Sequence, residues 1–228
     1  MAAHALGVAV DVVIFTVIDG TLRVLLTKRP ASHVTYPDSW SLPGGFVGAR
    51  ESAEAAAERE LAAKAGVEGV YLEQLYTFSD PDRDPRNRVV SIAYYALVSP
   101  DRLTSERGSH EPDWFDVGDT PKLAFDHDTI LRVAVERIRG KLDYTPICFQ
   151  LLPARFTLTE LQKVYEAVLD EPLDKRNFRS RVLKSGLVAE TDAFRTGNHR
   201  PAKLYEFVRR EGDQAPYGPS PGVFSRAG

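Results

Sequence analysis

The side chains best placed for chemistry lie on one expected helix, at positions 60, 63 and 64, which share about 100° of arc at helical spacing. Carboxylates at all three positions would form an oxygen-rich patch suited to a hard cation such as Mg2+ or Mn2+. The sequence has Glu60, Ala63 and Lys64 there. Because the ammonium of Lys64 opposes a divalent cation, these residues favour binding of an anion over binding of a metal.

A glycine-rich turn precedes this helix and completes the expected site. Pro43, Gly44 and Gly45 predict a turn, and glycines let a backbone approach a phosphate closely. The helix is expected to run from about Ser52 to Ala65, because Gly66 supplies a C-terminal stop signal. The turn and the helix together indicate a phosphate-binding corner.

The segment from Gly45 to Val67 resembles the Nudix box, G-x5-E-x7-R-E-U-x-E-E-x-G-U, in which U is a bulky aliphatic residue. Both glycines, Glu51, the Arg59-Glu60 pair and both aliphatic positions fall in register, whereas Ala63-Lys64 replaces the paired glutamates. An ordinary Ala/Glu-rich helix would not match so many spaced positions. The resemblance covers roughly residues 7–145 and implies the fold of a pyrophosphate hydrolase.

The same substitution argues against catalysis. Metal-assisted attack on a pyrophosphate needs an ion that polarises the phosphate and activates water. We therefore expect binding without turnover, with no catalytic residue, no metal ligand and no required cofactor, and with Lys64 supplying part of the missing positive charge. The alternative is an enzyme, an ADP-ribose pyrophosphatase with an accessory C-terminal domain, in which Asp80, Asp82 or Asp84 would replace the missing acids.

The polar loop 79–88, between expected strands at 70–78 and 89–98, is the second candidate ligand-binding segment. Arginine forks can bind a diphosphate bidentately and aromatic rings can stack on adenine, although loop arginines are often only solvated. Tyr76 to Asp80 followed by Arg83-Asp84-Pro85-Arg86 resembles a segment of ADP-ribose-type Nudix proteins, which implies ADP-ribose or a related nucleotide as the ligand. Lys28-Arg29 is a weaker candidate for the same pocket. The expected ligand-binding residues are Gly44, Gly45, Glu60, Lys64, Arg83, Arg86 and Arg88.

The C-terminal third predicts two helices and a hairpin. Thr157 to Glu160 is a capping-box pattern at the start of an amphipathic helix that Pro172 ends. Asp174 can cap a second helix, Lys175 to Lys184, before Gly186. Phe178, Val182 and Leu183 are expected to anchor this second helix inward. A β-hairpin over 187–191 and 203–208 follows, with 195–201 at its tip.

Helix, turn, basic helix and basic-tipped hairpin is the order of a winged helix-turn-helix, whose second helix can enter the major groove while the wing meets phosphates. A small helical extension with solvated arginines is the alternative. Residues 149–210 contain 12 Lys and Arg against 8 Asp and Glu, within a chain of net charge −3, which favours a polyanionic partner. The expected DNA-binding residues are Lys175, Arg176, Asn177, Arg179, Ser180, Arg181, Lys184, His199 and Arg200.

The stretches Phe-Thr-Leu-Thr-Glu-Leu-Gln and Leu-Asp-Lys-Arg-Asn-Phe-Arg resemble the C-terminal part of the Nudix-related transcriptional regulators of NAD metabolism, the NrtR family. The resemblance implies a DNA-binding homodimer that represses genes of NAD synthesis or salvage and senses ADP-ribose. Two copies of the basic helix would then recognise a roughly palindromic operator in double-stranded DNA. A regulator of the same type that controls a sugar-utilisation regulon is a further alternative.

Length and composition are consistent with two modest domains. The chain has 228 residues, of which 43% are hydrophobic and 27% charged, as in a globular protein. We expect an α+β protein, with a Nudix α/β/α sandwich over residues 1–145, a winged helix-turn-helix over 146–211 and a disordered tail over 212–228. A single cysteine, no bilayer-length apolar run and no basic leader before Asp11 predict a soluble cytoplasmic protein without a membrane partner.

Overall fold

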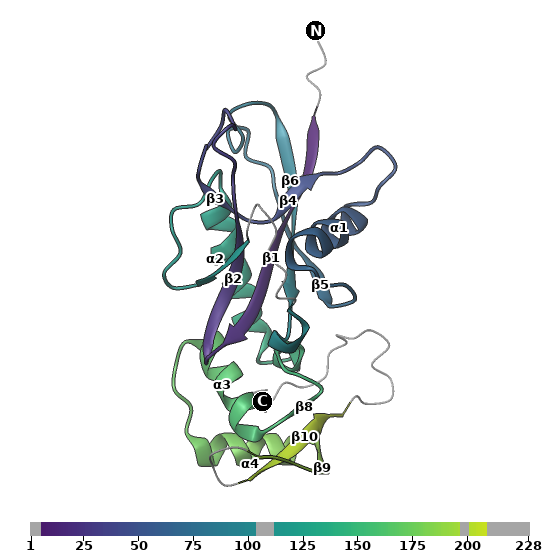
Figure 1. Ribbon diagram of the computed structural model, residues 1–228, viewed down its shortest axis with the longest axis vertical. Coiled ribbons are helices and arrows are strands. Elements are labelled where there is room, and N and C mark those ends of the chain that lie inside the picture. Colours follow the sequence, from purple (N-terminus) through teal and green to yellow (C-terminus); the bar gives the residue numbers. More distant parts are fainter. Residues whose placement is uncertain (1–5, 104–111, 197–200, 209–228) are drawn as a thin grey trace. The chain divides into compact units, whose positions relative to one another are not determined.

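The computed structural model describes residues 6–103, 112–196 and 201–208 (Figure 1). Within them the chain forms two compact units that divide between residues 135 and 136, and the short segments 17–22 and 99–101 group with the second unit. Residues 197–200 of the expected wing tip, 195–201, and the expected tail, 212–228, lie outside the described residues. No helix in the described ranges has the length and apolar character needed to cross a membrane.

The first unit is built on a mixed sheet with the strand order β3-β2-β1-β6-β5, in which β4 pairs with β1 and β7 pairs with β2. The central strand β1 lies parallel to β6, with Gly7 opposite Val89, and antiparallel to β4. Asp19 and Gly20, both at positive φ, form the turn that the sequence predicts between β1 and β2. The strands are β1 (Gly7–Ile18), β2 (Thr21–Lys28), β3 (Trp40–Ser41), β4 (Gly44–Phe46), β5 (Tyr71–Phe78), β6 (Val89–Leu97) and β7 (Asp113–Asp116).

Two helices lie on opposite sides of this sheet, α1 (Ala53–Ala65) and α2 (His127–Lys141) (Figure 1). The face that packs on α1 buries Val10, Val12 and Ile14 of β1 together with Leu61 of the helix. Because side chains alternate along a strand, the intervening residues of β1 are buried on the other face. The α/β/α layering predicted from the sequence is therefore confirmed.

The helix α1 begins and ends where the sequence predicts. Ser52 caps its N-terminus by accepting a hydrogen bond from the N–H of Ala55, and Gly66 ends it in the left-handed conformation at φ 66°. The Cβ of an alanine at Gly44 would stand 2.5 Å from the carbonyl oxygen of Val10. Glycine at this position thus lets the turn before α1 lie directly against β1.

The second unit contains a helix-turn-helix and a three-stranded sheet with the order β8-β10-β9, whose two pairings are both antiparallel. The expected capping box is present, since Thr157 Oγ1 accepts from Glu160 N at 3.1 Å and Glu160 Oε2 accepts from Thr157 N at 2.7 Å. This is the order of a winged helix. The elements from residue 100 on are η1 (Pro100–Arg102), η2 (Ile147–Leu151), β8 (Arg155–Phe156), α3 (Leu158–Leu169), α4 (Lys175–Ser185), β9 (Val188–Arg195) and β10 (Ala202–Phe207).

Candidate ligand pocket and nucleic-acid interface

Arg59 on α1 holds the loop between β4 and α1 in place. Its guanidinium donates to Glu51 at 2.8 and 3.1 Å and to the carbonyl oxygen of Phe46 at 3.2 Å. The hydrogen bonds from Arg59 and from the N–H of Gly48 lower the pKa of Glu51 to about 2. Glu51 and Arg59 therefore hold the backbone of this loop, and this structural role does not depend on the paired glutamates that the motif has elsewhere.

Glu60 does not fit a role as a metal ligand. Its side chain is only 7% exposed, is paired with Arg59 and lies against Gly45, and it does not line the neighbouring cavity. Lys64, one turn further along α1, lines that cavity. A hard divalent cation requires several oxygen ligands, and here the carboxylate of Glu60 is paired with a guanidinium while the next turn of the helix presents an ammonium. The donor set therefore does not suit the metal that a Nudix hydrolase uses.

A cavity of about 400 Å³ opens beside the glycine turn. Five of the seven expected ligand-binding residues line it, namely Gly44, Gly45, Lys64, Arg83 and Arg86. Lys28 and Arg29 also line the cavity, whereas its carboxylates are those of Asp11 and Asp84. In the part of the chain that the structure describes, the ammonium of Lys64 has neither an ion pair nor a hydrogen bond. The cavity therefore presents an excess of positive charge to an anion.

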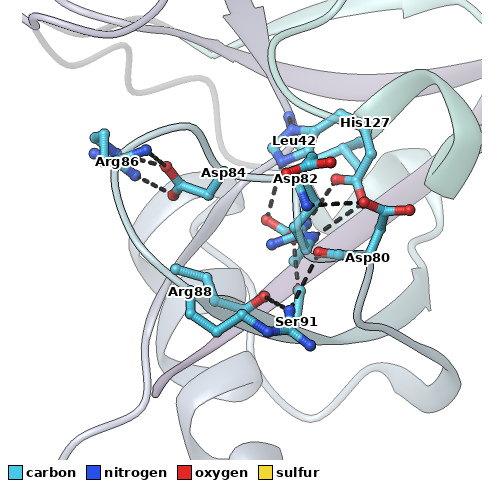
Figure 2. Close-up of polar contacts among 12 residues, drawn as sticks. Leu42, Asp80, Asp82, Asp84, Arg86, Arg88, Ser91 and His127 are labelled. Carbon is cyan, nitrogen blue, oxygen red and sulfur yellow. Dashed lines mark hydrogen bonds and ion pairs between the residues drawn. The ribbon is translucent and has the colours of Figure 1, made fainter. Parts of the chain in front are cut away.

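Arg83 supports the floor of the cavity through a buried polar network (Figure 2). It is 8% exposed and donates to Asp126 at 2.7 and 2.9 Å and to Asp11 at 3.2 Å. Ser91 Oγ donates to the same Asp11 carboxylate at 2.6 Å. The carboxylates of Asp11 and Asp126 thus already neutralise Arg83. A diphosphate would have to compete with both of them to bind Arg83 directly, as the sequence predicts.

His127 links this network to the glycine turn. Its Nδ1 accepts a hydrogen bond from the N–H of Leu42 at 2.9 Å, and its Nε2 lies 3.3 Å from Asp11 Oδ1. The imidazole therefore connects the backbone before the glycine turn to the carboxylate of Asp11. Burial alone would raise the pKa of Asp11, but attraction and hydrogen bonds from His127, Ser91 and Arg83 outweigh it and lower the pKa to about 2.

Phe125 forms an aromatic wall of the cavity close to two guanidinium groups. The Cζ atoms of Arg29 and Arg86 lie 4.9 and 5.4 Å from its ring centroid, within cation–π range. Phe125 has φ 58°, a left-handed conformation that a bulky residue adopts at a cost of about 1–3 kcal/mol and that concentrates at functional sites. Arg86 also pairs with Asp84 at 2.7 Å, apart from the Asp11 network (Figure 2).

Arg88 does not reach the cavity. Its guanidinium donates to the carbonyl oxygens of Ser79 at 2.9 Å and Asp80 at 3.2 Å, and so it closes the loop onto itself. The ligand-binding role expected of Arg88 is therefore corrected to a loop-positioning one. Asp80 accepts the backbone N–H of Asp82 at 2.8 Å. No group of three or more His, Cys, Asp or Glu side chains in the described ranges is arranged to hold a metal ion.

The exposed face of α4 is the candidate nucleic-acid interface. Phe178 and Val182 are buried and fix the rotation of the helix, and Phe178 meets Tyr165 of α3 edge-on at 5.4 Å. The N–H of Asn177 donates to the capping Asp174 at 2.8 Å. Six of the expected DNA-binding residues are exposed on this helix, namely Lys175, Arg176, Asn177, Ser180, Arg181 and Lys184.

One expectation about α4 is wrong, that of Leu183, and the side chain of Arg179 is engaged within this unit. Arg179 is expected from the sequence to bind DNA, but its Nη2 donates to Thr159 at the start of α3 at 3.0 Å and its Nε is buried. Leu183 is expected to anchor the helix inward, but it is 50% exposed. Helical spacing itself places Leu183 away from the two buried anchors, whereas the contact of Arg179 with α3 depends on packing between the two helices.

The described part of the wing is held by ion pairs. Arg195 at the end of β9 pairs with Glu160 at 2.8 Å and donates to the carbonyl oxygen of Arg155 at 3.2 Å. These contacts join the wing to the start of α3. The other two expected DNA-binding residues, His199 and Arg200, lie outside the described residues.

Comparison with known protein families agrees with both units. The Nudix domain model matches residues 7–134, and the model of the NrtR DNA-binding winged helix domain matches residues 148–207. The chain belongs to the NrtR family. It is 38% identical over 209 residues to the ADPR responsive transcriptional repressor NtrR of Acinetobacter baylyi, an alignment that covers 90% of this chain and 83% of that protein.

Solved structures of another NrtR protein show the same fold. The structure of Shewanella oneidensis NrtR with a 27mer DNA matches with a TM-score of 0.77 and 36% identity, over 88% of this chain and 93% of that one. The NUDIX domain of the same protein complexed with ADP ribose matches with a TM-score of 0.53 and 37% identity, over 60% of this chain and 91% of that one. The degenerate box is thus part of a family of regulators.

Sequence reasoning missed the buried network and the aromatic wall of the cavity. A carboxylate at Asp11, inside a β-branched strand, was the available signal, because a buried charge needs a partner. Its partners Arg83, Ser91 and His127 are far away in sequence, and no local spacing relates them. The left-handed conformation of Phe125 likewise has no sequence signal, since glycine or asparagine is the usual residue there.

Proposed function

We propose that this NrtR-family protein is a transcriptional repressor that binds operator DNA as a homodimer and responds to ADP-ribose. The observation that carries the proposal is the presence in one chain of a basic cavity unsuited to a metal and of an exposed basic helix in a winged helix. Residues 1–145 would form the sensing domain and residues 146–211 the DNA-binding domain. The target genes proposed are those of NAD synthesis or salvage.

The ligand half of the proposal rests on the charges of the cavity. ADP-ribose carries a diphosphate that Lys64 and the backbone of Gly44 and Gly45 can approach, and glycine N–H groups suit phosphate oxygens. Arg86 and Phe125 offer a guanidinium and an aromatic face to the rest of the ligand. Because Lys64 supplies the positive charge, binding would need no metal ion.

The DNA half rests on α4 and on symmetry. Arg176, Ser180 and Lys184 are exposed on one face of a capped helix, as base and phosphate contacts in the major groove require. A homodimer with twofold symmetry would present two such helices to two half-sites, so the operator should be roughly palindromic. A sugar-utilisation regulon stays the alternative set of targets, and a genome-wide map of bound DNA distinguishes the two.

The enzymatic alternative makes a different prediction. An ADP-ribose pyrophosphatase would hydrolyse ADP-ribose when Mg2+ or Mn2+ is added, and we expect no turnover above background. Metal-dependent hydrolysis by the purified protein that Glu60→Ala abolishes would contradict the proposal. Because Glu60 also packs against Gly45, the melting temperature of the variant must be measured alongside its activity.

The direct test of DNA binding uses the full-length protein and duplexes selected from a random-sequence library. We expect enrichment of a palindromic sequence and binding that weakens as salt rises, because phosphate contacts release counterions. Arg176→Ala should weaken binding to the selected duplex by about 1–3 kcal/mol, the value of one bidentate base contact. Failure to enrich any sequence, with no affinity for DNA at low salt, would refute the regulator assignment.

A further inference from the structure

Leu183 is an exposed apolar residue on an otherwise polar helix face. Half of its surface is accessible to solvent, whereas Phe178 and Val182 on the same helix are buried. Transferring a leucine side chain from water to an apolar environment is favourable, so burial of Leu183 against an apolar group would strengthen binding of whatever covers this face. On the wing, the ring centroid of the exposed Phe194 already lies 5.0 Å from the ammonium of Lys203.

The rotation of α4 places Leu183 on the face that would meet DNA. At about 100° per residue, Ser180 lies opposite the midpoint of the two buried anchors, and Leu183 lies about 60° from Ser180. Arg176 lies about 40° from Ser180 on the same side. The contact from Arg179 to Thr159 and the edge-on packing of Phe178 on Tyr165 hold this rotation.

The chemistry of this face matches the floor of a major groove. Arg176, Ser180 and Lys184 can donate hydrogen bonds to base edges or phosphates, and Leu183 can offer only apolar contact. The single apolar group on a base edge in the major groove is the C5-methyl of thymine, which the other three bases lack. Resting on the repressor function proposed above, we propose that Leu183 is a specificity-determining residue that contacts a thymine methyl in each operator half-site.

A self-association surface is a weaker explanation of the same leucine. Arg176 and Lys184 flank it, so two copies of this face would bring like charges together. The phosphates of DNA instead neutralise these charges while the groove covers the leucine. The occupant that fits both the apolar residue and its cationic border is therefore double-stranded DNA.

The experiment removes the methyl group without changing base pairing. The selected duplex is prepared with deoxyuridine in place of thymidine, first at all positions and then singly, and its affinity for the full-length protein is measured. Burial of one methyl group corresponds to about a fourfold change in affinity, so one position in each half-site should respond by roughly that factor. Replacement in both half-sites together should weaken binding about fifteenfold.

Leu183→Ala completes the test. The variant should bind the thymidine duplex more weakly than the wild type but should bind the thymidine and deoxyuridine duplexes equally well. Lys184→Ala is the matched control, because loss of an adjacent cation should weaken both duplexes by the same factor and leave the methyl effect intact. Melting temperature and sedimentation of both variants should match those of the wild type, since the two side chains are exposed.

Three outcomes would overturn the proposal: a wild type indifferent to deoxyuridine at every position, a Leu183→Ala variant that keeps the full methyl effect, or a loss of dimerisation in that variant with its methyl effect retained. Failure of the library selection itself would instead refute the repressor function, so the two failures are distinguishable.

Discussion

At the scale of residues, we expect the positive charge of Lys64 to favour anionic ligands in the cavity. Its ammonium lines the cavity at a box position where a Nudix hydrolase has an acid, and no acid in the described residues pairs with it. We expect Lys64→Glu to weaken ADP-ribose binding at least tenfold in the absence of metal, because a carboxylate would face the diphosphate. Isothermal titration calorimetry checks this, with Lys163→Glu on α3 of the second unit as a charge-matched control.

The same substitution joined to Ala63→Glu restores the paired glutamates. We expect the double variant to gain affinity for Mn2+ without regaining hydrolysis, because Glu60 stays engaged by Arg59. An unchanged ADP-ribose affinity in Lys64→Glu would contradict the role assigned to the lysine.

Asp11 gives the fold a predictable response to acid. Its pKa is lowered to about 2 in the folded protein, against about 3.9 in an unfolded chain. A carboxylate with a lowered pKa contributes stability that is complete above about pH 4 and is lost as pH falls towards 2, here about 2.5 kcal/mol. Asp11→Asn should therefore lower the free energy of unfolding at pH 7 by about that amount. Between pH 4 and 2, the free energy of unfolding of the variant should change less than that of the wild type.

Urea unfolding at a series of pH values measures this difference. Asp19→Asn, at an exposed turn position, is the control and should keep the pH profile of the wild type. If the free energy of unfolding of Asp11→Asn fell with pH in parallel with that of the wild type, the pKa of Asp11 would not be lowered in the folded protein.

At the scale of elements, two glycines lie in different surroundings. One lies in close contact with a neighbouring strand, and the other affects only the propensity of its helix. Gly44→Ala would place a Cβ 2.5 Å from the carbonyl oxygen of Val10, so the turn must move and we expect lost stability and weaker ADP-ribose binding. Gly140 is exposed within α2, and a Cβ added there would have no atom within 4 Å, so Gly140→Ala should stabilise the helix by about 1 kcal/mol. Thermal unfolding of the two variants should shift in opposite directions, and shifts of the same sign would contradict this account.

Two arginines on α4 can be distinguished in the same way, because one contacts α3 and the other is exposed. Arg179 braces α4 against α3 through Thr159, whereas Arg176 is exposed. Arg179→Ala should lower the melting temperature by a few degrees and weaken DNA binding only as a consequence, while Arg176→Ala should weaken DNA binding with no change in melting temperature. Comparing both quantities for both variants tests the assignment, which would fail if Arg179→Ala left stability unchanged.

Most elements were predictable from the sequence because their signals are local. The caps at Ser52, Thr157 and Asp174 and the glycine after α1 each lie within four residues of the backbone group that they satisfy. The Asp11 network was not predictable, since its members come from β1, the 79–88 loop, β6 and the start of α2. The contact of Arg179 with Thr159 was not predictable either, because it depends on packing against α3.

At the scale of the whole molecule, the proposed function requires the two binding activities to be coupled. A ligand shifts a conformational equilibrium only by its difference in affinity for the two states, so ADP-ribose must bind differently to the DNA-competent and DNA-incompetent forms. An operator with fixed half-site spacing would detect a modest change in the separation of two α4 helices. By reciprocity, operator DNA must weaken ADP-ribose binding by the same factor as ADP-ribose weakens DNA binding.

The most direct test of this coupling is a titration of the preformed protein–operator complex with ADP-ribose, followed by fluorescence anisotropy of labelled DNA, with AMP and NAD as controls. We expect ADP-ribose to release the DNA, with an apparent DNA affinity at least tenfold lower at saturation, and the controls to act more weakly. An unchanged DNA affinity at saturating ADP-ribose, with ligand binding confirmed by calorimetry, would contradict the account.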